Sequence, residues 1–467
     1  MDIALQQDTQ ARMRQIFTTW WPLAASWLLM ALETPALSIV VARLAEPEIN
    51  LAAYGGVVFP IALLIESPII MLLAASTALS KDWASYRLGW VYMMSAGAAL
   101  TAIHILIAFT PLYYVVVGDI IQVPEEIIEP ARIGLMIMLP WTWSIAYRRF
   151  NQGVLIRTGR SKMVGKGTVI RLSTNVTVLV IGYLIGSLPG IVVGSSAVAC
   201  GVMSEALFIG LVIRPVLRNE LRNAPPVDPP LTWRAFWAFY IPLVMTSLLM
   251  LLANPIGSAA LSRMPKALES LAIWPVITSI IFLLRSLGVA YNEVVVALLD
   301  ERGASIYLRR FADYLAAATT LFLLIITATP LSSLWFRGIM ALQPELADMA
   351  QQALWLALPL PALTVAQSWC QGAILYGQRT RSLTESVVIY LIISLIVLGT
   401  GVGFGNIPGL YIGILALTLS VGAQTVWLWI RSAHVRRMLK GRDRRIRTDE
   451  GNKYRLVESS PAGTPFT

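Results

Sequence analysis

The chain has 467 residues, of which 57% are hydrophobic and only 13% are charged, and its formal net charge is +10. A soluble globular chain carries roughly 45–50% apolar and about 25% charged residues, so this composition excludes an ordinary water-soluble protein. The basic excess suggests nucleic acid at first sight. Most Lys and Arg, however, gather at the N-terminus, in alternate loops and in the C-terminal tail, which is the positive-inside pattern of a membrane protein. We therefore expect no nucleic-acid partner.

Long apolar runs recur along the whole chain. A bilayer core needs about 20 mostly apolar residues per helix. Basic residues gather in the loops after even-numbered runs, which predicts both termini on the cytoplasmic side of a cell inner (plasma) membrane. We predict an all-α polytopic membrane protein with twelve transmembrane helices, near residues 14–43, 51–79, 88–115, 128–156, 164–187, 190–216, 234–262, 270–299, 308–335, 345–375, 381–403 and 408–434.

The first half of the sequence recurs in the second half at a shift of 219–220 residues. The stretches "QGVLIRTGRSK" and "QGAILYGQRTR", which begin at Gln152 and Gln371, show it most clearly. A shift that stays constant over much of the chain indicates tandem duplication of a six-helix unit, and an even number of helices gives a parallel repeat. Other matched residues are Pro22 with Pro242, Pro35 with Pro255, Ser38 with Ser258, and Arg43 with Arg263.

A proline-rich stretch, "RNELRNAPPVDPPLTW", joins the two repeats. We predict an N-terminal lobe at 1–218, a cytoplasmic linker at 219–233, a C-terminal lobe at 234–435, and a tail at 436–467 that is basic and then disordered. Duplicated bundles of this kind commonly bind substrate at the repeat interface and rock around it. The pattern favours a transporter over a non-transporting membrane scaffold.

Over about residues 14–434 the chain resembles the multidrug/oligosaccharidyl-lipid/polysaccharide (MOP) flippase superfamily. Two six-helix lobes, a proline in each long first helix and the Gln-Gly-aliphatic-basic signature carry the resemblance. The stretch Glu33–Gly55 is also similar to the start of the progressive ankylosis branch. The resemblance implies a V-shaped, MATE-like bundle pair with a cavity between the lobes. In the multidrug branch an acidic residue in the first helix or its neighbours often couples transport to an ion, and the resemblance offers Glu33 for that role.

The first helix of each lobe carries small and polar residues at i, i+4 spacing, which share one helix face. They are Thr34 and Ser38 in the first helix and Asn254 and Ser258 in the seventh. Such a face lines a cavity or packs against a neighbouring helix, and the resemblance favours the cavity. Pro35 and Pro255 each remove a helix hydrogen bond at equivalent depth, so we predict a hinge at each.

Charges inside predicted helices are functional candidates because each costs about 2.5–3.5 kcal/mol at the bilayer centre. Glu66 lies in the second run and Arg285 in the eighth, at positions that match in the repeat. They would pair across the cavity or bind opposite ends of a substrate. Glu205 and Glu293 are read more simply as members of structural pairs.

Arg148 and Arg149 lie toward the cytoplasmic end of the fourth run. We expect them to snorkel to the surface. The alternative is a positive lining of the inner mouth of the cavity.

The sequence predicts no catalytic site and no metal site. Its two cysteines, Cys200 and Cys370, and its two histidines, His104 and His434, form no cluster of metal-ligand spacing. No Gly-rich phosphate loop or nucleophile motif occurs. We predict no enzyme and no cofactor beyond a coupling H+ or Na+.

The predicted function is secondary active transport by alternating access, as ion-coupled efflux of small amphiphilic solutes. The alternatives are a flippase for lipid-linked saccharide, an exporter of small organic anions and, from other classes, a non-transporting scaffold or a membrane-embedded enzyme. The expected partners are a small-molecule or lipid-linked substrate and membrane lipids, and a monomer is compatible with the pattern.

Overall fold

The computed structural model describes residues 2–299, 301, 303–377 and 381–458. The first half contains α1 (Asp2–Ala31), α2 (Glu33–Val41), α3 (Pro47–Ala53), α4 (Phe59–Ile70), α5 (Leu72–Leu79), α6 (Trp83–Phe109), α7 (Leu112–Tyr114), α8 (Glu125–Ile137), α9 (Leu139–Arg157), α10 (Ser161–Ile185) and α11 (Gly190–Asn219). The second half contains α12 (Trp233–Ser262), α13 (Ala267–Leu298), α14 (Ala304–Ala328), α15 (Leu331–Ser333), α16 (Pro344–Leu356), α17 (Leu360–Tyr376), α18 (Arg381–Phe404) and α19 (Gly409–Glu458). Three short π-helices, η1 (Tyr54–Val58), η2 (Val115–Ile121) and η4 (Leu334–Ile339), and one 3-10 helix, η3 (Leu221–Asn223), complete the helices of the described residues.

The prediction of an all-α polytopic membrane protein is confirmed. Ten helices of the described ranges are long and apolar enough to cross a membrane, or eleven if α16 and α17, bent by 42°, form one span. The predicted fourth run, 128–156, becomes α8 and α9 and falls outside this count. The reason is charge, because α9 carries Arg148, Arg149 and Arg157 within its 19 residues.

Local backbone features recur at the shift that the sequence repeat predicts. The helix after the first span begins from a left-handed residue in both halves, Glu46 (φ 48°) and Lys266 (φ 54°). The Asn50 side chain accepts a hydrogen bond from the backbone N–H of Ile191 (2.8 Å), and the Ser270 hydroxyl accepts one from that of Leu410 (3.1 Å). These contacts hold the start of the last helix of each half, α11 and α19, in the same way.

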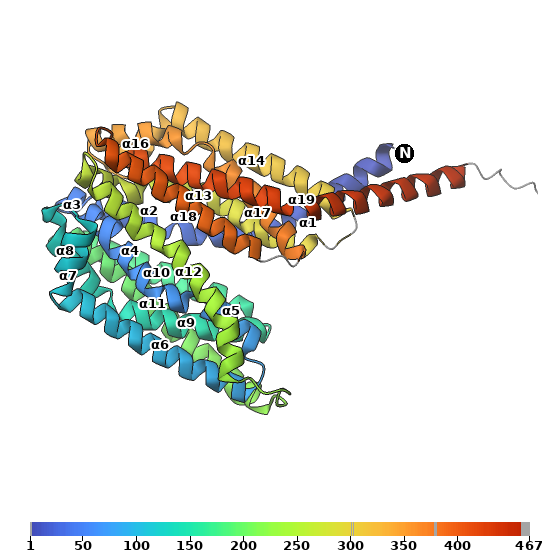
Figure 1. Ribbon diagram of the computed structural model, residues 1–467, viewed down its shortest axis with the longest axis horizontal. Coiled ribbons are helices and arrows are strands. Elements are labelled where there is room, and N and C mark those ends of the chain that lie inside the picture. Colours follow the sequence, from blue (N-terminus) through green and yellow to red (C-terminus); the bar gives the residue numbers. More distant parts are fainter. Residues whose placement is uncertain (1, 300, 302, 378–380, 459–467) are drawn as a thin grey trace, which may run out of the picture.

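The first helix of each half packs against the other half over the part that lies nearer the linker and termini (Figure 1). In α1, Trp20 donates through Nε1 to the carbonyl of Leu287 in α13 (3.0 Å). In α12, Tyr240 donates through its hydroxyl to the carbonyl of Pro68 in α4 (2.6 Å). The two contacts are equivalent in the repeat, so α1–α2 and α12 act as crossing helices that tie the halves together.

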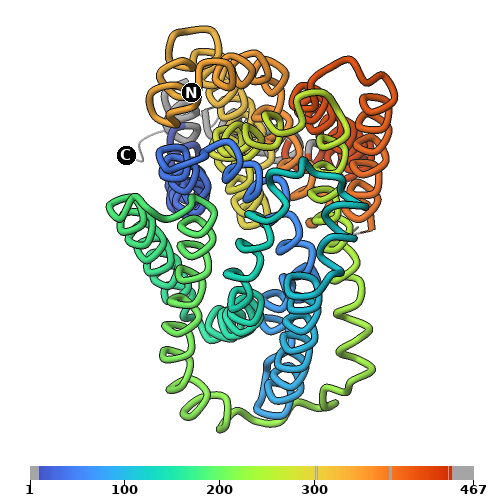
Figure 2. Tube along the Cα trace, turned by 90° about the vertical axis from the view of Figure 1, so that its left-hand side faces the viewer, coloured from blue at the N-terminus to red at the C-terminus, as the bar shows by residue number. Residues whose placement is uncertain are grey.

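At their other ends the crossing helices return to their own halves, because α2 packs on α10 and α11, and α12 on α18 and α19. Two reciprocal contacts close this end. Arg43 donates to the carbonyl of Gly338 (3.2 Å), and Arg263 donates to the carbonyls of Ile120 (2.5 Å) and Ile121 (3.2 Å). Toward the termini and the linker the two groups of helices diverge (Figures 1 and 2).

The predicted tail begins as a continuation of α19, which runs to Glu458. The Asp443 carboxylate accepts hydrogen bonds from the backbone N–H groups of Gly303 (3.2 Å) and Ser305 (3.1 Å) at the start of α14. The disorder expected after the basic stretch stays a prediction. Residues 459–467 lie outside the described residues.

Candidate functional site

Two pockets adjoin each other beside the crossing helices. The central pocket has a volume of about 420 Å³ and is lined from both halves, with Thr34 of α2 and Asn254 of α12 in its wall. The first-half pocket has a volume of about 150 Å³ and lies among α2, α4, α9, α10 and α11. Thr34, Tyr54 and Phe59 line both pockets, so the two pockets share part of their walls.

Glu33 begins an ion-pair network around the first-half pocket. One carboxylate oxygen lies 3.2 Å from Nη2 of Arg171 in α10, and the other accepts a hydrogen bond from Asn175 (3.1 Å). Nε of Arg171 lies 3.6 Å from the carboxylate of Glu205 in α11. Arg171 therefore bridges two acids that come from different helices.

Glu205 is fully buried and is the other centre of this network. Its carboxylate accepts from Arg148 (2.5 Å) and from the Gln152 amide (2.9 Å), both on α9. Glu66 of α4 is also buried and lines the pocket with Arg148 and Arg149, and its Oε1 atom has no hydrogen-bond partner among the described residues. Two carboxylates and three guanidinium groups thus line the first-half pocket, and Glu205 contacts Arg148 and Arg171 from behind its wall.

The expectation that Arg148 and Arg149 snorkel to the surface is wrong. Both side chains line the first-half pocket, and Arg148 is 5% exposed. The buried carboxylate of Glu205 holds Arg148 inward, because an ion pair offsets part of the cost of leaving water. The reading of Glu205 as a member of a buried pair agrees with the structure. Arg171 was not among the predicted site residues. It is a charged residue in the middle of an apolar helix, which is the same signal that identified Glu66.

Arg285 of α13 is half-buried in the wall of the central pocket. Its Nε donates a hydrogen bond to the Thr364 hydroxyl of α17 (2.8 Å). Among the described residues that line this pocket, Arg285 alone is charged. Over the same residues the structure shows no ion pair between Arg285 and Glu66, which lies in the other pocket.

The remaining predicted site residues divide into two groups. Thr34 and Asn254 both line the central pocket. Ser38 and Ser258 are buried and line neither pocket, although each shares a helix face with the pocket residue one turn before it. Glu293 is exposed and accepts a hydrogen bond from Trp27.

The two predicted hinges have different local structure. The first helix is interrupted at Leu32, between α1 and α2 and close to Pro35. By contrast, α12 runs unbroken through Pro255. The hinge role of both prolines stays a prediction.

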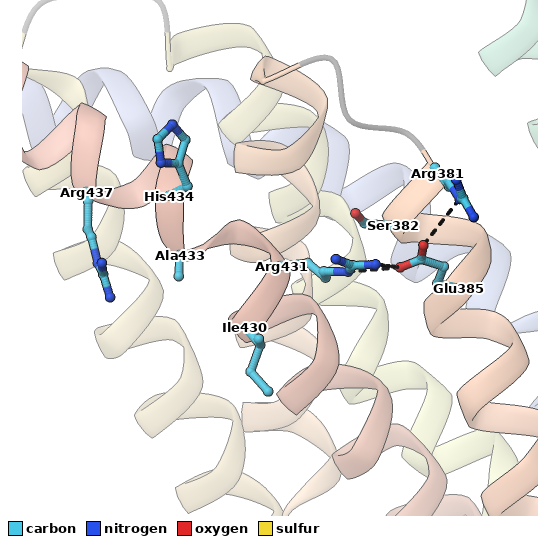
Figure 3. A pocket seen from close by; sticks show the side chains of 8 residues that line it. All are labelled: Arg381, Ser382, Glu385, Ile430, Arg431, Ala433, His434 and Arg437. Carbon is cyan, nitrogen blue, oxygen red and sulfur yellow. Dashed lines mark hydrogen bonds and ion pairs between the residues drawn. The ribbon is translucent and has the colours of Figure 1, made fainter.

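A third hollow, of about 730 Å³, lies at the linker-side ends of α18 and α19 (Figure 3). Arg431 and Arg381 converge there on the Glu385 carboxylate, at 2.6 and 3.4 Å. His434 and Arg437 stand on the same wall. The groove is formed by one half only and by largely exposed side chains, so it is a surface feature outside the crossing region. No group of three or more His, Cys, Asp or Glu within the described ranges is placed to hold a metal ion.

No protein-family model and no curated protein sequence matches the chain. Solved structures do. The structure of a multidrug resistance MATE family transporter of the MOP superfamily, in an inward-facing conformation, superposes with a TM-score of 0.64 at 16% identity, covering 89% of this chain and 98% of that one. The chain has the fold of the MATE transporters.

Two further structures share this MATE fold. A MOP superfamily transporter from Pyrococcus furiosus, described as having a binding pocket of reverse polarity, gives a TM-score of 0.62 at 17% identity, over 91% of this chain and 96% of that one. The lipid II flippase MurJ, in an inward closed conformation, gives 0.66 at 15% identity, over 88% and 87%. The superfamily resemblance read from the sequence is therefore borne out by the fold, while the similarity to the progressive ankylosis branch stays a prediction.

Proposed function

We propose that the protein is a secondary transporter that moves small amphiphilic solutes out of the cell by alternating access, with the central pocket as its solute site. One observation carries the proposal. The two crossing helices, which connect the halves mechanically, also line the pocket, at the repeat-equivalent residues Thr34 and Asn254. Movement of one half against the other would therefore change access to the pocket directly.

The arrangement of contacts supports this mechanism. Arg43 and Arg263 bind the opposite half at one end, and the halves diverge at the other (Figure 1). From this arrangement we infer that the pocket opens toward the side that carries the termini, which the charge distribution predicts to be the cytoplasm. Breaking these contacts at one end while the other closes would carry a solute across.

The first-half pocket supports coupling to an ion gradient. Protonation of Glu33, or its binding of Na+, would remove the ion pair with Arg171. Glu33 directly follows the helix break at Leu32 and precedes Pro35, so a change in its pairing would act at a weak point of the first helix. The ion itself is left to experiment.

The volume of the central pocket favours a small solute over a lipid-linked saccharide. Sites for drug-sized ligands span about 300–1,000 Å³, and the central pocket lies within that range at about 420 Å³. A non-transporting scaffold gives no reason for a solute-sized pocket at the crossing of the two halves.

Counterflow into proteoliposomes, with a panel of charged and neutral amphiphilic solutes, tests the proposal. Asn254→Trp fills the central pocket and is expected to lower the transport rate at least about tenfold, because the solute loses its site. Met250→Trp is the matched control, since Met250 lies one turn away, is 53% exposed and lines neither pocket. Equal transport by Asn254→Trp and the parent would contradict the proposal.

A further inference from the structure

We infer that Arg285 binds an anionic group of the transported solute, so that the natural solute is an amphiphilic anion with one carboxylate, sulfonate or phosphate group. The inference rests on the proposed function and deepens it, because it assigns a chemical class to the solute. It stands on three observations: the pairing of Arg285, the charge of the equivalent pocket in the first half, and the lining of the central pocket.

The first observation is how Arg285 is held. Its Nε donates to the Thr364 hydroxyl at 2.8 Å, which fixes the plane of the guanidinium group in the pocket wall. In the part of the chain that the structure describes, no carboxylate lies within ion-pair distance of it. A positioned guanidinium presents a planar fork of N–H donors, which matches a carboxylate or a phosphate with two parallel hydrogen bonds.

A membrane protein gains nothing in stability from such a group. An arginine at the centre of a membrane helix costs about 2.5–3.5 kcal/mol on insertion scales. At Arg148 and Arg171 the cost is offset, since both pair with acids. Arg149 makes no ion pair within the described residues, but it shares its pocket with the carboxylate of Glu66. Arg285 has a neutral partner instead, which leaves its charge available to a ligand.

The second observation comes from comparing the two halves through the repeat. Two carboxylates and three guanidinium groups line the first-half pocket, and the buried Glu205 pairs with two of these arginines from behind the wall, so the formal charges of the six residues cancel. At the equivalent positions of the second half all but one residue are uncharged. Glu33, Arg148, Arg149, Arg171 and Glu205 correspond to Ala253, Gln367, Ser368, Tyr390 and Gln424, and Glu66 corresponds to Arg285.

The second-half residues therefore keep one positive charge and no protein acid to balance it. A solute that brings its own anionic group restores the balance that the first half achieves with Glu33, Glu66 and Glu205. Glu66 does not neutralise Arg285, because it lies in the first-half pocket beside Arg148 and Arg149.

The third observation is the rest of the central pocket. Trp274, Phe282 and Tyr390 line it together with aliphatic side chains, while Thr278 and Asn254 supply neutral polar groups. Aromatic and aliphatic walls bind an apolar body through the area they bury. One cationic group in such a wall selects an anion with an apolar part rather than a highly charged polyanion.

Equilibrium binding of three probes of nearly equal size tests the inference. The probes are 4-phenylbutyrate, its neutral amide and 4-phenylbutylamine, titrated by calorimetry into the full chain in nanodiscs, with empty nanodiscs as the blank. The parent is expected to bind the carboxylate at least about tenfold more tightly than the amide, and the amine most weakly.

Variants at position 285 then identify the residue responsible. Arg285→Gln is expected to bind the carboxylate and the amide equally, and Arg285→Lys to keep part of the preference, since it retains the charge and loses the fork. Arg431→Gln is the charge-matched control, because it removes an exposed guanidinium from the surface groove of Figure 3. Should Arg285→Gln fail to fold, Arg285→Lys and the parent still decide the preference.

Equal affinity of the parent for all three probes, tighter binding of the amine, or an unchanged preference in Arg285→Gln would overturn the inference. Its failure is distinct from failure of the proposed function. Transport of cationic solutes only would refute the anionic solute class and would still support the proposed transport function. Arg285-dependent binding of the carboxylate without counterflow of any solute would refute the transport function and would still support the anion site at Arg285.

Discussion

Glu205 is the residue on which the packing of α9, α10 and α11 converges. It is fully buried, and it contacts Arg148, Gln152 and Arg171. Removing one partner of a buried ion pair leaves an uncompensated charge, which typically costs about 3–5 kcal/mol. An exposed pair contributes only about 0–1 kcal/mol.

We predict that Glu205→Ala lowers the stability of the folded protein by a few kcal/mol, on the order of 3–5. The matched control is Glu220→Ala, which removes a carboxylate from an exposed pair with Arg160 and should change stability by about 1 kcal/mol or less. Thermal unfolding in detergent, followed by tryptophan fluorescence, measures both. Equal effects of the two substitutions would show that the network contributes no more than a surface pair.

Glu33 gives a functional prediction at the same scale. Glu33→Gln keeps the size of the side chain and removes its charge, so it is expected to abolish accumulation driven by an ion gradient. Binding of the solute at equilibrium should change by less than roughly tenfold, about 1.4 kcal/mol, because Glu33 does not line the central pocket. Glu293→Gln, which alters an exposed carboxylate, serves as the control. Uphill transport by Glu33→Gln at the parental rate would make Glu33 a structural residue.

The sequence identifies single charged residues within apolar helices, but it does not identify the side chains with which they pair. The cost of burial marked Glu66, Arg285 and Glu33, because that cost depends only on residue type and depth. Whether Arg148 points to the surface or inward depends on Glu205, 57 residues away and on another helix. Tertiary packing sets the direction of such a side chain. The periodicity of a single helix gives no information about that packing.

Among the elements, the crossing helices show what a repeat predicts and what it leaves open. The shift of 219–220 residues predicted equivalent positions for Pro35 and Pro255 and the even helix count of each half. It did not predict that α1 and α12 each pack part of their length on the other half. Packing on the helix's own half and packing on the other half would bury the same apolar faces, so the sequence pattern does not distinguish them. The Trp20–Leu287 and Tyr240–Pro68 contacts show that each crossing helix packs on the opposite half.

The start of α6 carries a prediction for pH. Asp82, outside the predicted membrane spans, caps α6 through Ser85 and accepts a hydrogen bond from the backbone N–H of Val227 in the linker (3.0 Å). Burial alone would raise the pKa of Asp82, but the hydrogen bonds from Ser85 and Val227 outweigh it and the pKa is lowered. The charged form therefore stabilises the docked linker above the usual aspartate pKa of about 3.9. That stability is lost as the pH falls below this value through the folded-state pKa.

We expect Asp82→Asn, which mimics the protonated form, to release the linker at neutral pH. Limited proteolysis should then cut residues 221–232 faster than in the parent. Asp228→Asn, a change of the same charge within the linker itself, is the control. Cleavage of Asp82→Asn at the parental rate would mean that other contacts hold the linker.

For the whole molecule, the reciprocal contacts of Arg43 and Arg263 fix which end is closed. We predict that Arg43→Ala combined with Arg263→Ala favours opening at that end. Asn254→Cys, in a chain without Cys200 and Cys370, should then react faster with an impermeant maleimide added from that side. Arg337→Ala is the control, because Arg337 pairs with Asp348 within the second half. No change in labelling would show that these two residues do not hold the gate.

Alternating access requires that the two halves open in turn around one pocket. Distances between spin labels test it most directly, with one pair at Ile120 and Ile339 near the Arg43 end and a second pair at Lys81 and Arg381 near the linker, all exposed. On addition of a transported solute or an ion gradient, we expect the first distance to grow while the second shrinks. Two distances that stay constant, or that change in the same direction, would contradict alternating access.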